Sequence, residues 1–299
     1  MTDGFKSGFV ALIGRPNAGK STLLNSLVGQ KIAIISDKPQ TTRNKIVGVL
    51  TKPHFQAIFL DTPGIHKPQH KLGQIMVDTA LNTLREVDLI YYLVDVTVPF
   101  GGGEEYIIEK LQKVDTPVFL LLNKIDCLKK TELLPLLDFY RQKREWTEIV
   151  PISALSGENL GHLLEATLPY FEEGPQYYPE DALTDQPERV LVAELIREKI
   201  IVLTHEEVPH SVAVTVEMME RRSENLLYIG ATIFVERSSQ KAIIIGKNGE
   251  MLKKIGTGAR REIETLLGDK IYLELWVKVK ADWRNSVRNL REFGYDGRE

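Results

Sequence analysis

The chain has 299 residues, of which 43% are hydrophobic and 26% charged, and its formal net charge is −3. This composition excludes disordered and fibrous proteins. Because the net charge is negative, the overall charge of the protein would not attract it to nucleic acid. The length is about twice that of a common domain, which predicts two domains. A single cysteine, Cys127, and the lack of a basic-then-apolar pattern at Met1–Lys6 indicate a reducing cytoplasm.

The first half of the chain alternates short apolar runs with segments of helical periodicity. Strands are expected at 9–13, 57–60, 89–95, 118–123 and 149–152, with helices at 72–86 and 105–114. Strands that alternate with helices predict an α/β domain, a mostly parallel sheet with helices on both faces. The segment 174–187 is rich in Pro, Gly and acidic residues, which predicts a linker. The first domain is therefore expected over 1–173.

The second half of the chain, 188–299, is expected to form a smaller α+β domain with a basic C-terminal tail. Its elements are predicted in the order helix, strand, strand, helix, helix, strand. The first helix is expected at 188–204 and the two strands at 211–218 and 226–236. A short helix leading into 243, a longer helix at 250–267 and a strand at 271–280 follow. No internal repeat makes this half a copy of the first.

A glycine-rich turn follows the first predicted strand and precedes a helix-compatible run. It has the sequence GRPNAGKS over Gly14–Ser21. In this context, successive backbone N–H groups can cradle phosphates, Lys20 adds positive charge and the Ser21 hydroxyl completes a Mg²⁺ shell. The predicted phosphate-binding residues are Gly14, Asn17, Ala18, Gly19, Lys20, Ser21 and Thr22.

The base of the nucleotide is expected to be read after two later strands. The sequence Asn123-Lys124-Ile125-Asp126 places a carboxylate where it can accept hydrogen bonds from N1–H and the exocyclic amine of guanine, whereas adenine offers no such donor pair. Lys124 would lie along the base, and Asn123 would tie this loop to the phosphate loop. The segment Ser153-Ala154-Leu155 would close over the guanine with backbone N–H groups. These residues select GTP and GDP.

Two further segments are expected near the γ-phosphate and Mg²⁺. Asp61 begins the sequence Asp-Thr-Pro-Gly after an apolar strand, so it can reach Mg²⁺ through water while the Gly64 N–H approaches the γ-phosphate. Thr41 and Thr42 lie in a polar stretch suited to a mobile loop. One of them, by preference Thr42, would bind Mg²⁺ only when the γ-phosphate is present. The predicted metal-binding residues are Ser21, Thr42 and Asp61.

The second domain carries a candidate RNA-binding turn, Gly246-Lys247-Asn248-Gly249, between two predicted helices. A Gly-x-x-Gly turn of this kind packs a sugar–phosphate backbone against a helix N-terminus. Residues 237–261 contain seven lysines and arginines and one glutamate, a net charge of +6 that attracts phosphates. The predicted RNA-binding residues are Gly246, Lys247, Asn248, Gly249, Lys253, Lys254 and Arg260. The tail residues Trp283, Arg284, Arg288 and Arg291 could extend the path, and Trp276 could equally be core.

Together these motifs resemble one family. The ordered set Gly14–Ser21, Thr41-Thr42, Asp61–Gly64, Asn123–Asp126 and Ser153–Leu155, with the appended domain, is similar to the Era-like family of bacterial Ras-like GTPases (TrmE-Era type) with a C-terminal KH domain. The resemblance implies hydrolysis of GTP to GDP and phosphate, with Lys20, Thr42 and Asn17 as catalytic residues. It implies that Asn17 helps hold K⁺ against the phosphates. It also implies a type II KH domain that binds the 3′ end region of 16S ribosomal RNA and acts in 30S subunit assembly.

One position departs from the mechanism of the best-known small GTPases. Ile65 stands where those enzymes have the glutamine that orients the attacking water. His66 and His70 lie nearby, but a histidine in a polar loop is more often merely solvated. Era-like proteins are similar in having a hydrophobic residue here.

Two other functions stay open at this point. A non-enzymatic RNA-binding module would use nucleotide only to stabilise its fold. A membrane-associated switch would use residues 72–86 as an amphipathic segment at the inner face of the cell membrane, although a core-facing helix is the commoner meaning of that pattern. We expect a cytoplasmic monomer.

Overall fold

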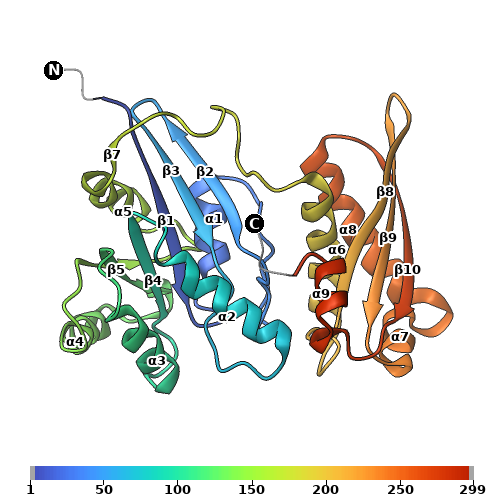
Figure 1. The fold of residues 1–299 in the computed structure, drawn as a ribbon, viewed down its shortest axis with the longest axis horizontal. Helices are drawn as coiled ribbons and strands as arrows, with labels where there is room; N and C mark the ends of the chain where they lie inside the picture. Colours follow the sequence, from blue (N-terminus) through green and yellow to red (C-terminus); the bar gives the residue numbers. More distant parts are fainter. Residues whose placement is uncertain (1–3, 296–299) are drawn as a thin grey trace. The chain divides into compact units, whose positions relative to one another are not determined.

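The computed structural model describes residues 4–295, so residues 1–3 and 296–299, at the ends of the predicted domains, lie outside the described part. The chain divides into two compact units (Figure 1). The first unit contains the residues up to Ala33 together with Thr42–Pro68 and Gly73–Asp185. The second contains Ile34–Thr41, Gln69–Leu72 and the residues from Gln186 onward.

The first unit is built on a sheet in the order β2-β3-β1-β4-β5-β6, with β7 paired to β1. Its strands are β1 (Lys6–Gly14), β2 (Ile46–Lys52), β3 (Phe55–Asp61), β4 (Leu89–Asp95), β5 (Val118–Asn123), β6 (Glu148–Ile152) and β7 (Glu172–Glu173). β1 is parallel to β3 and β4, and β4, β5 and β6 continue the parallel order. β2 pairs antiparallel with β3, and β7 pairs antiparallel with the start of β1. The sheet is therefore mostly parallel, as predicted.

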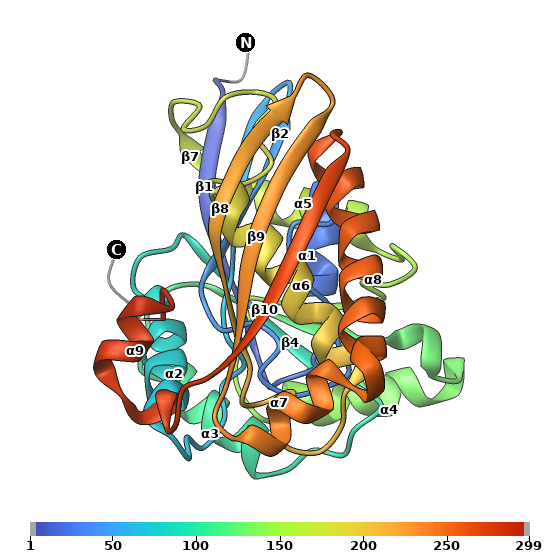
Figure 2. The same ribbon diagram turned by 90° about the vertical axis from the view of Figure 1, so that its right-hand side faces the viewer.

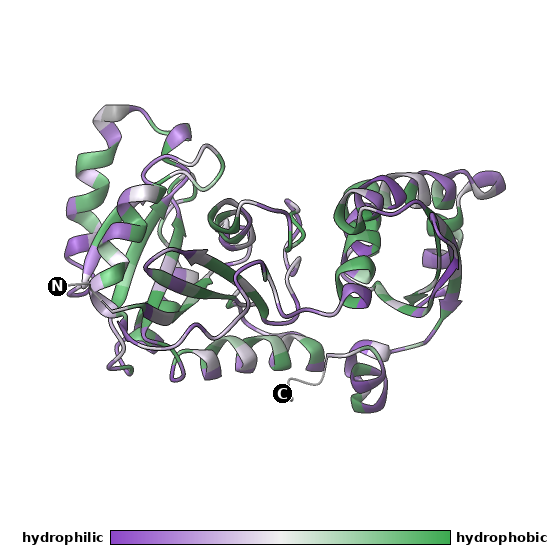
Figure 3. Cartoon of the chain, turned by 90° about the horizontal axis from the view of Figure 1, so that it is seen from above, coloured by the Kyte–Doolittle hydropathy of each residue, from purple (hydrophilic) through white to green (hydrophobic). Residues whose placement is uncertain are grey.

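Helices cover both faces of this sheet (Figure 1). They are α1 (Lys20–Val28), α2 (Lys71–Thr83), α3 (Gly102–Leu111), α4 (Lys130–Arg141) and α5 (Leu160–Thr167). Successive strand residues point to opposite faces, so Val10 and Leu12 pack in one apolar cluster with α1 and α5. Ala11 and Ile13 pack in another with α2, α3 and α4. Figure 3 shows the hydrophobic strands of this core in green.

The apolar side of α2 is part of that core. Met76, Val77 and Ala80 are buried, and Ala80 and the following Leu84 belong to the same apolar cluster as Ile13. The amphipathic pattern over 72–86 therefore has its commoner meaning, a helix that faces the core. None of the helices in residues 4–295 is long and apolar enough to cross a bilayer.

Most of the predicted linker is bound to the first unit by hydrogen bonds. Gln56, in β3, donates from Nε2 to the carbonyl oxygen of Tyr178 at 2.9 Å and accepts from the backbone N–H of Tyr177 at 2.8 Å. The Val49 N–H donates to the carbonyl oxygen of Leu183 at 2.9 Å. These long-range bonds extend the first unit through Asp185, beyond the predicted domain end at 173.

The second unit is a three-stranded sheet, in the order β10-β9-β8, with helices on one face (Figure 2). Its elements are α6 (Glu188–Leu203), β8 (Ala213–Ser223), β9 (Leu226–Val235), α7 (Ser238–Ile245), α8 (Glu250–Leu267), β10 (Ile271–Val279) and α9 (Val287–Glu292). β8 and β9 are antiparallel, and β9 and β10 are parallel. Residues such as Ile196 of α6 and Ile255 of α8 pack on the sheet in one apolar cluster. The predicted order of elements is observed.

The residues after β10 correct one expectation. Trp283 is fully buried, its Nε1–H donates to the carbonyl oxygen of Ser211 at 2.9 Å, and its ring packs on Phe293. Arg284 forms an ion pair with Glu236 at 2.6 Å. These two side chains hold α9 to the domain, so they do not extend an RNA path. Trp276 is 38% exposed, so it is not a core residue.

Candidate nucleotide and RNA sites

The predicted nucleotide-binding residues gather at the carboxyl ends of the parallel strands of the first unit. Gly14 ends β1, Asp61 ends β3, Asn123 ends β5, and Ser153 follows β6. In an open α/β sheet, ligands bind in the crevice at this edge. The segments that carry Lys20, Gly64, Asp126 and Ala154 follow these strand ends, which lie at one edge of the sheet because the four strands are parallel.

The glycine-rich turn has the conformation that its sequence predicts. Gly19 precedes α1 with φ +98, and a Cβ added there would lie 2.2 Å from the Nδ2 atom of Asn123. Only glycine fits this left-handed, crowded position. Lys20 is 4% exposed, and its ammonium donates to the carbonyl oxygens of Gly14 at 3.3 Å and Arg15 at 2.9 Å. The lysine is thereby held over the turn.

Three oxygen-bearing side chains meet beside Lys20. The Ser21 Oγ lies 2.8 Å from the Thr42 Oγ1, and it donates to the Asp61 Oδ2 at 2.6 Å. Asp61 is fully buried, and its Oδ1 has no hydrogen-bond partner among the described residues. Hard oxygen donors with an unused carboxylate oxygen suit Mg²⁺. The three residues predicted to bind the metal therefore lie together and fit it.

Burial shifts the pKa values of the two ionisable side chains in this cluster, Asp61 and Lys20. Burial raises the pKa of Asp61 to about 6, although Lys20 and the hydroxyls of Ser21 and Thr42 oppose that shift. Burial likewise lowers the pKa of Lys20 to about 8, although Asp61 opposes this. The buried carboxylate and the buried ammonium compensate each other only in part, so each can still gain from a further opposite charge. A phosphate group and a divalent cation would supply both.

The segment after β3 lies against the phosphate turn. The backbone N–H of Ile65 donates to the carbonyl oxygen of Gly14 at 3.0 Å. Ile65 itself is 1% exposed and belongs to the apolar cluster of Ile13. His66 bonds through Nδ1 to the carbonyl oxygen of Gly64 at 2.8 Å. Ile65 is thus a core side chain, and because it has no polar atom it cannot orient water as a glutamine would.

Asn123 connects three loops of the predicted guanine site. Its Nδ2 donates to the carbonyl oxygen of Ala18 at 2.8 Å, and its Oδ1 accepts from the backbone N–H of Ala154 at 2.9 Å. The carbonyl oxygen of Ala154 in turn accepts from Ser26 at 2.6 Å. Leu155 is 80% exposed and Asp126 is also exposed, so both are accessible to a base. The hydrogen bond from Ser153 and that from Cys127 lower the pKa of Asp126 despite slight desolvation, so the carboxylate is ionised at neutral pH.

Sequence reasoning missed two charged residues at this site. Asp95 ends β4 directly beside Asn123 in the sheet register and forms an ion pair with Lys124. Burial raises the pKa of Asp95, but hydrogen bonds from Lys124 and Thr97 lower it more. Its position at the carboxyl end of a buried strand was the available signal. Glu104, which is paired with Arg15 at 2.9 Å, gave no such signal.

The Gly-x-x-Gly turn of the second unit lies between α7 and α8. Gly246 has φ +72, Asn248 φ +52 and Gly249 φ +78, so three of its four residues adopt positive φ. Lys247, Asn248, Lys253, Lys254 and Arg260 are all exposed. A groove of about 430 Å³ runs between α8 and β10 and includes Gly249, Lys253 and Arg260 in its lining. The groove wall from β10, with Tyr272 and Glu274, was not among the predicted site residues.

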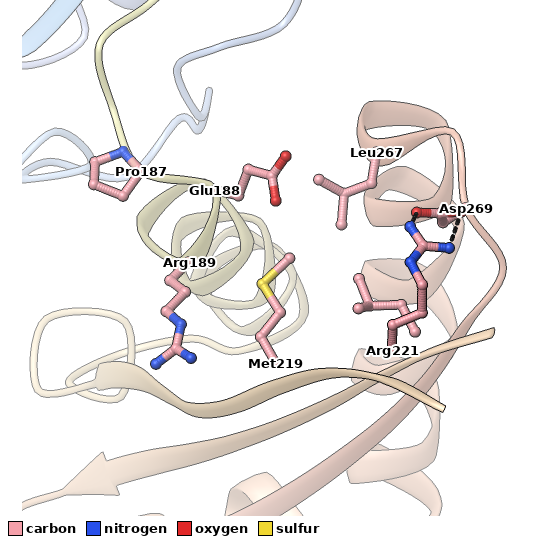
Figure 4. Close-up of a pocket in the computed structure, with 8 residues that line it drawn as sticks. Pro187, Glu188, Arg189, Met219, Arg221, Leu267 and Asp269 are labelled. Atoms are coloured by element: carbon pink, nitrogen blue, oxygen red, sulfur yellow. Dashed lines mark hydrogen bonds and ion pairs between the residues drawn. The ribbon is translucent and has the colours of Figure 1, made fainter. Parts of the chain in front are cut away.

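A second pocket in this unit, of about 570 Å³, contains none of the predicted residues (Figure 4). It lies where α6 begins, at Glu188, and where α8 ends, at Leu267. The Arg221–Asp269 ion pair, at 2.6 Å, forms part of its wall. The pocket therefore does not belong to the Gly-x-x-Gly groove.

Comparisons with known proteins agree with both sites. Residues 9–124 match the family model of 50S ribosome-binding GTPases, and residues 207–284 match that of the KH domain. The chain is 47% identical to Era in complex with MgGDPNP and nucleotides 1506–1542 of 16S ribosomal RNA, with a TM-score of 0.94 over 97% of this chain and 99% of that one. It is 46% identical to a variant of Aquifex aeolicus Era bound to GDP and AlF4⁻, with the same TM-score and coverage.

Proposed function

The chain belongs to the Era family of GTPases with a C-terminal KH domain, and on that premise we propose that it is a switch in ribosome assembly. As a member of this family it hydrolyses GTP to GDP and phosphate with Mg²⁺. In the proposal, its KH domain binds the 3′ end of 16S ribosomal RNA, and the protein acts in maturation of the 30S subunit. We further propose that it works as a cytoplasmic monomer.

The observation that carries the proposal is the presence of both sites in a chain matched over 97% of its length to Era holding MgGDPNP and a 16S RNA fragment. The oxygen cluster of Ser21, Thr42 and Asp61 supports the nucleotide half. The exposed basic Gly-x-x-Gly turn and the groove beside α8 support the RNA half.

Several residues of the nucleotide site would each contribute to hydrolysis in a different way. Mg²⁺, when bound, neutralises charge that develops on the transferring phosphoryl group. Lys20, whose ammonium is held by the carbonyl oxygens of Gly14 and Arg15, would meet the phosphates, and Ser21 and Thr42 would offer hydroxyl oxygens to the metal. Since Ile65 carries no polar atom, backbone groups of the loops must orient the attacking water. We propose that Asn17 helps hold a K⁺ ion against the phosphates.

The remaining alternatives differ in support. A non-enzymatic RNA-binding module has no need for a Ser21, Thr42 and Asp61 cluster beside a buried lysine. Membrane association rested on residues 72–86, whose apolar side chains are used in the core. Co-sedimentation with anionic vesicles tests that alternative directly, and binding there would restore it.

The deciding experiment measures GTP hydrolysis and RNA binding by the same full-length protein. We expect hydrolysis to require Mg²⁺, and we expect anisotropy titrations to give tighter binding to a 16S 3′-end oligonucleotide than to its scrambled control. Crosslinking to cellular RNA followed by sequencing should recover small-subunit RNA. A set of crosslinked RNAs without it would overturn the assembly role while leaving the GTPase intact.

A further inference from the structure

The segment Ile34–Thr41 packs in the second unit, although it links two parts of the nucleotide site along the chain. The chain leaves the first unit after Ala33 and returns to it at Thr42. Ile34 is 2% exposed and lies in the apolar cluster of α6 residues Val192 and Ile196. The polypeptide therefore passes from one unit to the other at the Thr41–Thr42 peptide bond.

Two consecutive residues of α6 hold this segment at both ends. The Arg197 Nη2 donates to the carbonyl oxygen of Thr41, and the Glu198 Oε1 accepts from the backbone N–H of Ile35 at 2.9 Å. Within the segment, the Thr41 hydroxyl donates to the carbonyl oxygen of Lys38 at 2.7 Å. The segment is thus folded on itself and bound to α6 through backbone atoms.

Arg197 is an unusual residue for the interior of this unit. Its side chain is fully buried and pairs with Glu194, whose Oε1 accepts from Nε at 2.7 Å. Its Nη1 has no hydrogen-bond partner among the described residues. A buried ion pair contributes little net stability compared with apolar residues of similar size. Stability alone therefore does not explain why an arginine stands at this buried position, but its hydrogen bond to the Thr41 carbonyl oxygen does.

We propose that Arg197 is a positioning residue for GTP and Mg²⁺ that acts through Thr42, an inference that rests on the proposed function. The carbonyl oxygen that Arg197 holds belongs to the planar peptide group whose other end is the Cα of Thr42. Fixing that oxygen therefore limits where the Thr42 hydroxyl can lie. That hydroxyl is 2.8 Å from the Ser21 Oγ in the metal-binding cluster.

The choice of arginine has a geometric reason. The guanidinium reaches Glu194 through Nε and Nη2 and Thr41 through Nη2 at the same time, because its donors form a rigid fork. A lysine would keep the charge but offers one ammonium on a flexible stem. Arg197→Lys thus separates the charge of this residue from its grip on the Thr41 carbonyl.

The test titrates Mg²⁺ into full-length protein with a fluorescent, hydrolysis-resistant GTP analogue. Loss of a hydrogen bond to a charged group predicts that Arg197→Gln and Arg197→Lys each raise the Mg²⁺ concentration for half-maximal analogue binding by about tenfold. Affinity for GDP should stay unchanged, since Thr42 meets the metal only beside a γ-phosphate. In a Thr42→Ala background, Arg197→Lys should add nothing, because the two residues act as one unit.

The control is Arg221→Gln, which removes another arginine–carboxylate pair of the same unit, away from the segment. It should leave both nucleotide titrations at wild-type values. If Arg197→Gln unfolds, Arg197→Lys and Glu198→Ala carry the test. Wild-type Mg²⁺ dependence in the Arg197 variants, or a lowered melting temperature as their only change, would overturn the inference. A wild-type protein that binds no GTP analogue would instead overturn the proposed function.

Discussion

Asn123 donates a hydrogen bond to the carbonyl oxygen of Ala18 at 2.8 Å, across 105 positions of sequence. The bond joins the end of β5 to the phosphate turn. The same side chain accepts from the backbone N–H of Ala154, so one amide joins the glycine-rich turn to the two loops that are predicted to read the base.

Asn123→Ala should therefore weaken GTP and GDP equally. Both lost partners are buried backbone groups, and each unsatisfied group costs about 1–3 kcal/mol. Isothermal titration with the two nucleotides measures the effect. Asn159→Gly, which removes an exposed amide near β6 at a position with φ +63, serves as the control. A variant that loses GTP affinity but keeps GDP affinity would show that Asn123 acts at the γ-phosphate instead.

Asp126→Asn should exchange preference for guanine for preference for xanthine. The amide presents a donor where guanine N1–H also donates, so GTP affinity should fall by about 2–4 kcal/mol and XTP should restore part of it. The side chain is exposed, so folding should be unaffected. Competition of XTP and GTP against a fluorescent nucleotide is the measurement. Unchanged GTP affinity would remove Asp126 from the base-reading site.

Gly249→Asp should abolish RNA binding while leaving GTP affinity intact. An added Cβ at Gly249 meets nothing within 4 Å, so the carboxylate would occupy the space that a phosphate backbone needs. Gly246→Asp is a poorer probe, since its Cβ would lie 2.7 Å from the Cβ of Met251 and strain the turn. Because φ is +78 at Gly249, Gly249→Asn is the matched control for backbone strain. In filter binding across a salt series, RNA binding by Gly249→Asp should be near background, and Gly249→Asn should retain salt-sensitive binding. Equal binding curves for the wild type and Gly249→Asp would exclude the turn from the RNA site.

Ile65→Ala should reduce stability far more than catalysis. The side chain is buried in the core, so the cavity should cost about 2–5 kcal/mol of unfolding free energy. Turnover should change much less than the 10²-fold or more that removal of a charge-stabilising donor costs. Urea denaturation and single-turnover hydrolysis separate the two effects. A large loss of rate at full stability would assign a catalytic role to this position.

Replacing K⁺ by Na⁺ should slow hydrolysis by the wild type, and Asn17→Ala should erase the difference. Asn17 has φ +65, where alanine is strained, so Asn17→Gly keeps the backbone and removes the amide. If loss of the amide causes the effect, the two variants should show the same hydrolysis rates in K⁺ and in Na⁺. If backbone strain causes it, the rates of the two variants should differ from each other. Equal wild-type rates in the two salts would point to RNA or another partner as the source of the missing positive charge.

Much of this architecture could be predicted because its signals are local. The bounds of β4, β5 and α8 follow from short apolar runs and a helical period bounded by glycine, and the structure reproduces them. β2 went unpredicted, since a polar stretch before it indicated a loop and only its antiparallel pairing with β3 makes it a strand. α4 was missed for a similar reason, because Pro135 and the exposed Leu134 obscure its period.

The parts of the site that sequence could not predict depend on distant contacts. Arg197 resembles any charged residue of an amphipathic helix until Thr41, 156 positions away, is brought to it. Trp283 lies among arginines in the sequence, which favoured a role on the surface, yet its indole packs inside. The turn over Gly14–Ser21 and the meeting of Ser21 with Asp61 could be expected, in contrast, because phosphate and metal chemistry requires fixed residue types at fixed spacings.

The pairing of β7 with β1 bears on how such a chain can be rearranged. Lys6 lies opposite Glu173 and Ser7 opposite Glu172, so the first and last strands of the GTPase unit are hydrogen-bonded neighbours. A short peptide that joined them would allow new termini to be opened in a surface loop, such as the one between α4 and β6, without loss of any strand pair. The GTPase unit is therefore suited to circular permutation. A foreign domain, in contrast, would have to be inserted after Asp185, because the residues between β7 and that point are hydrogen-bonded to Gln56 and Val49.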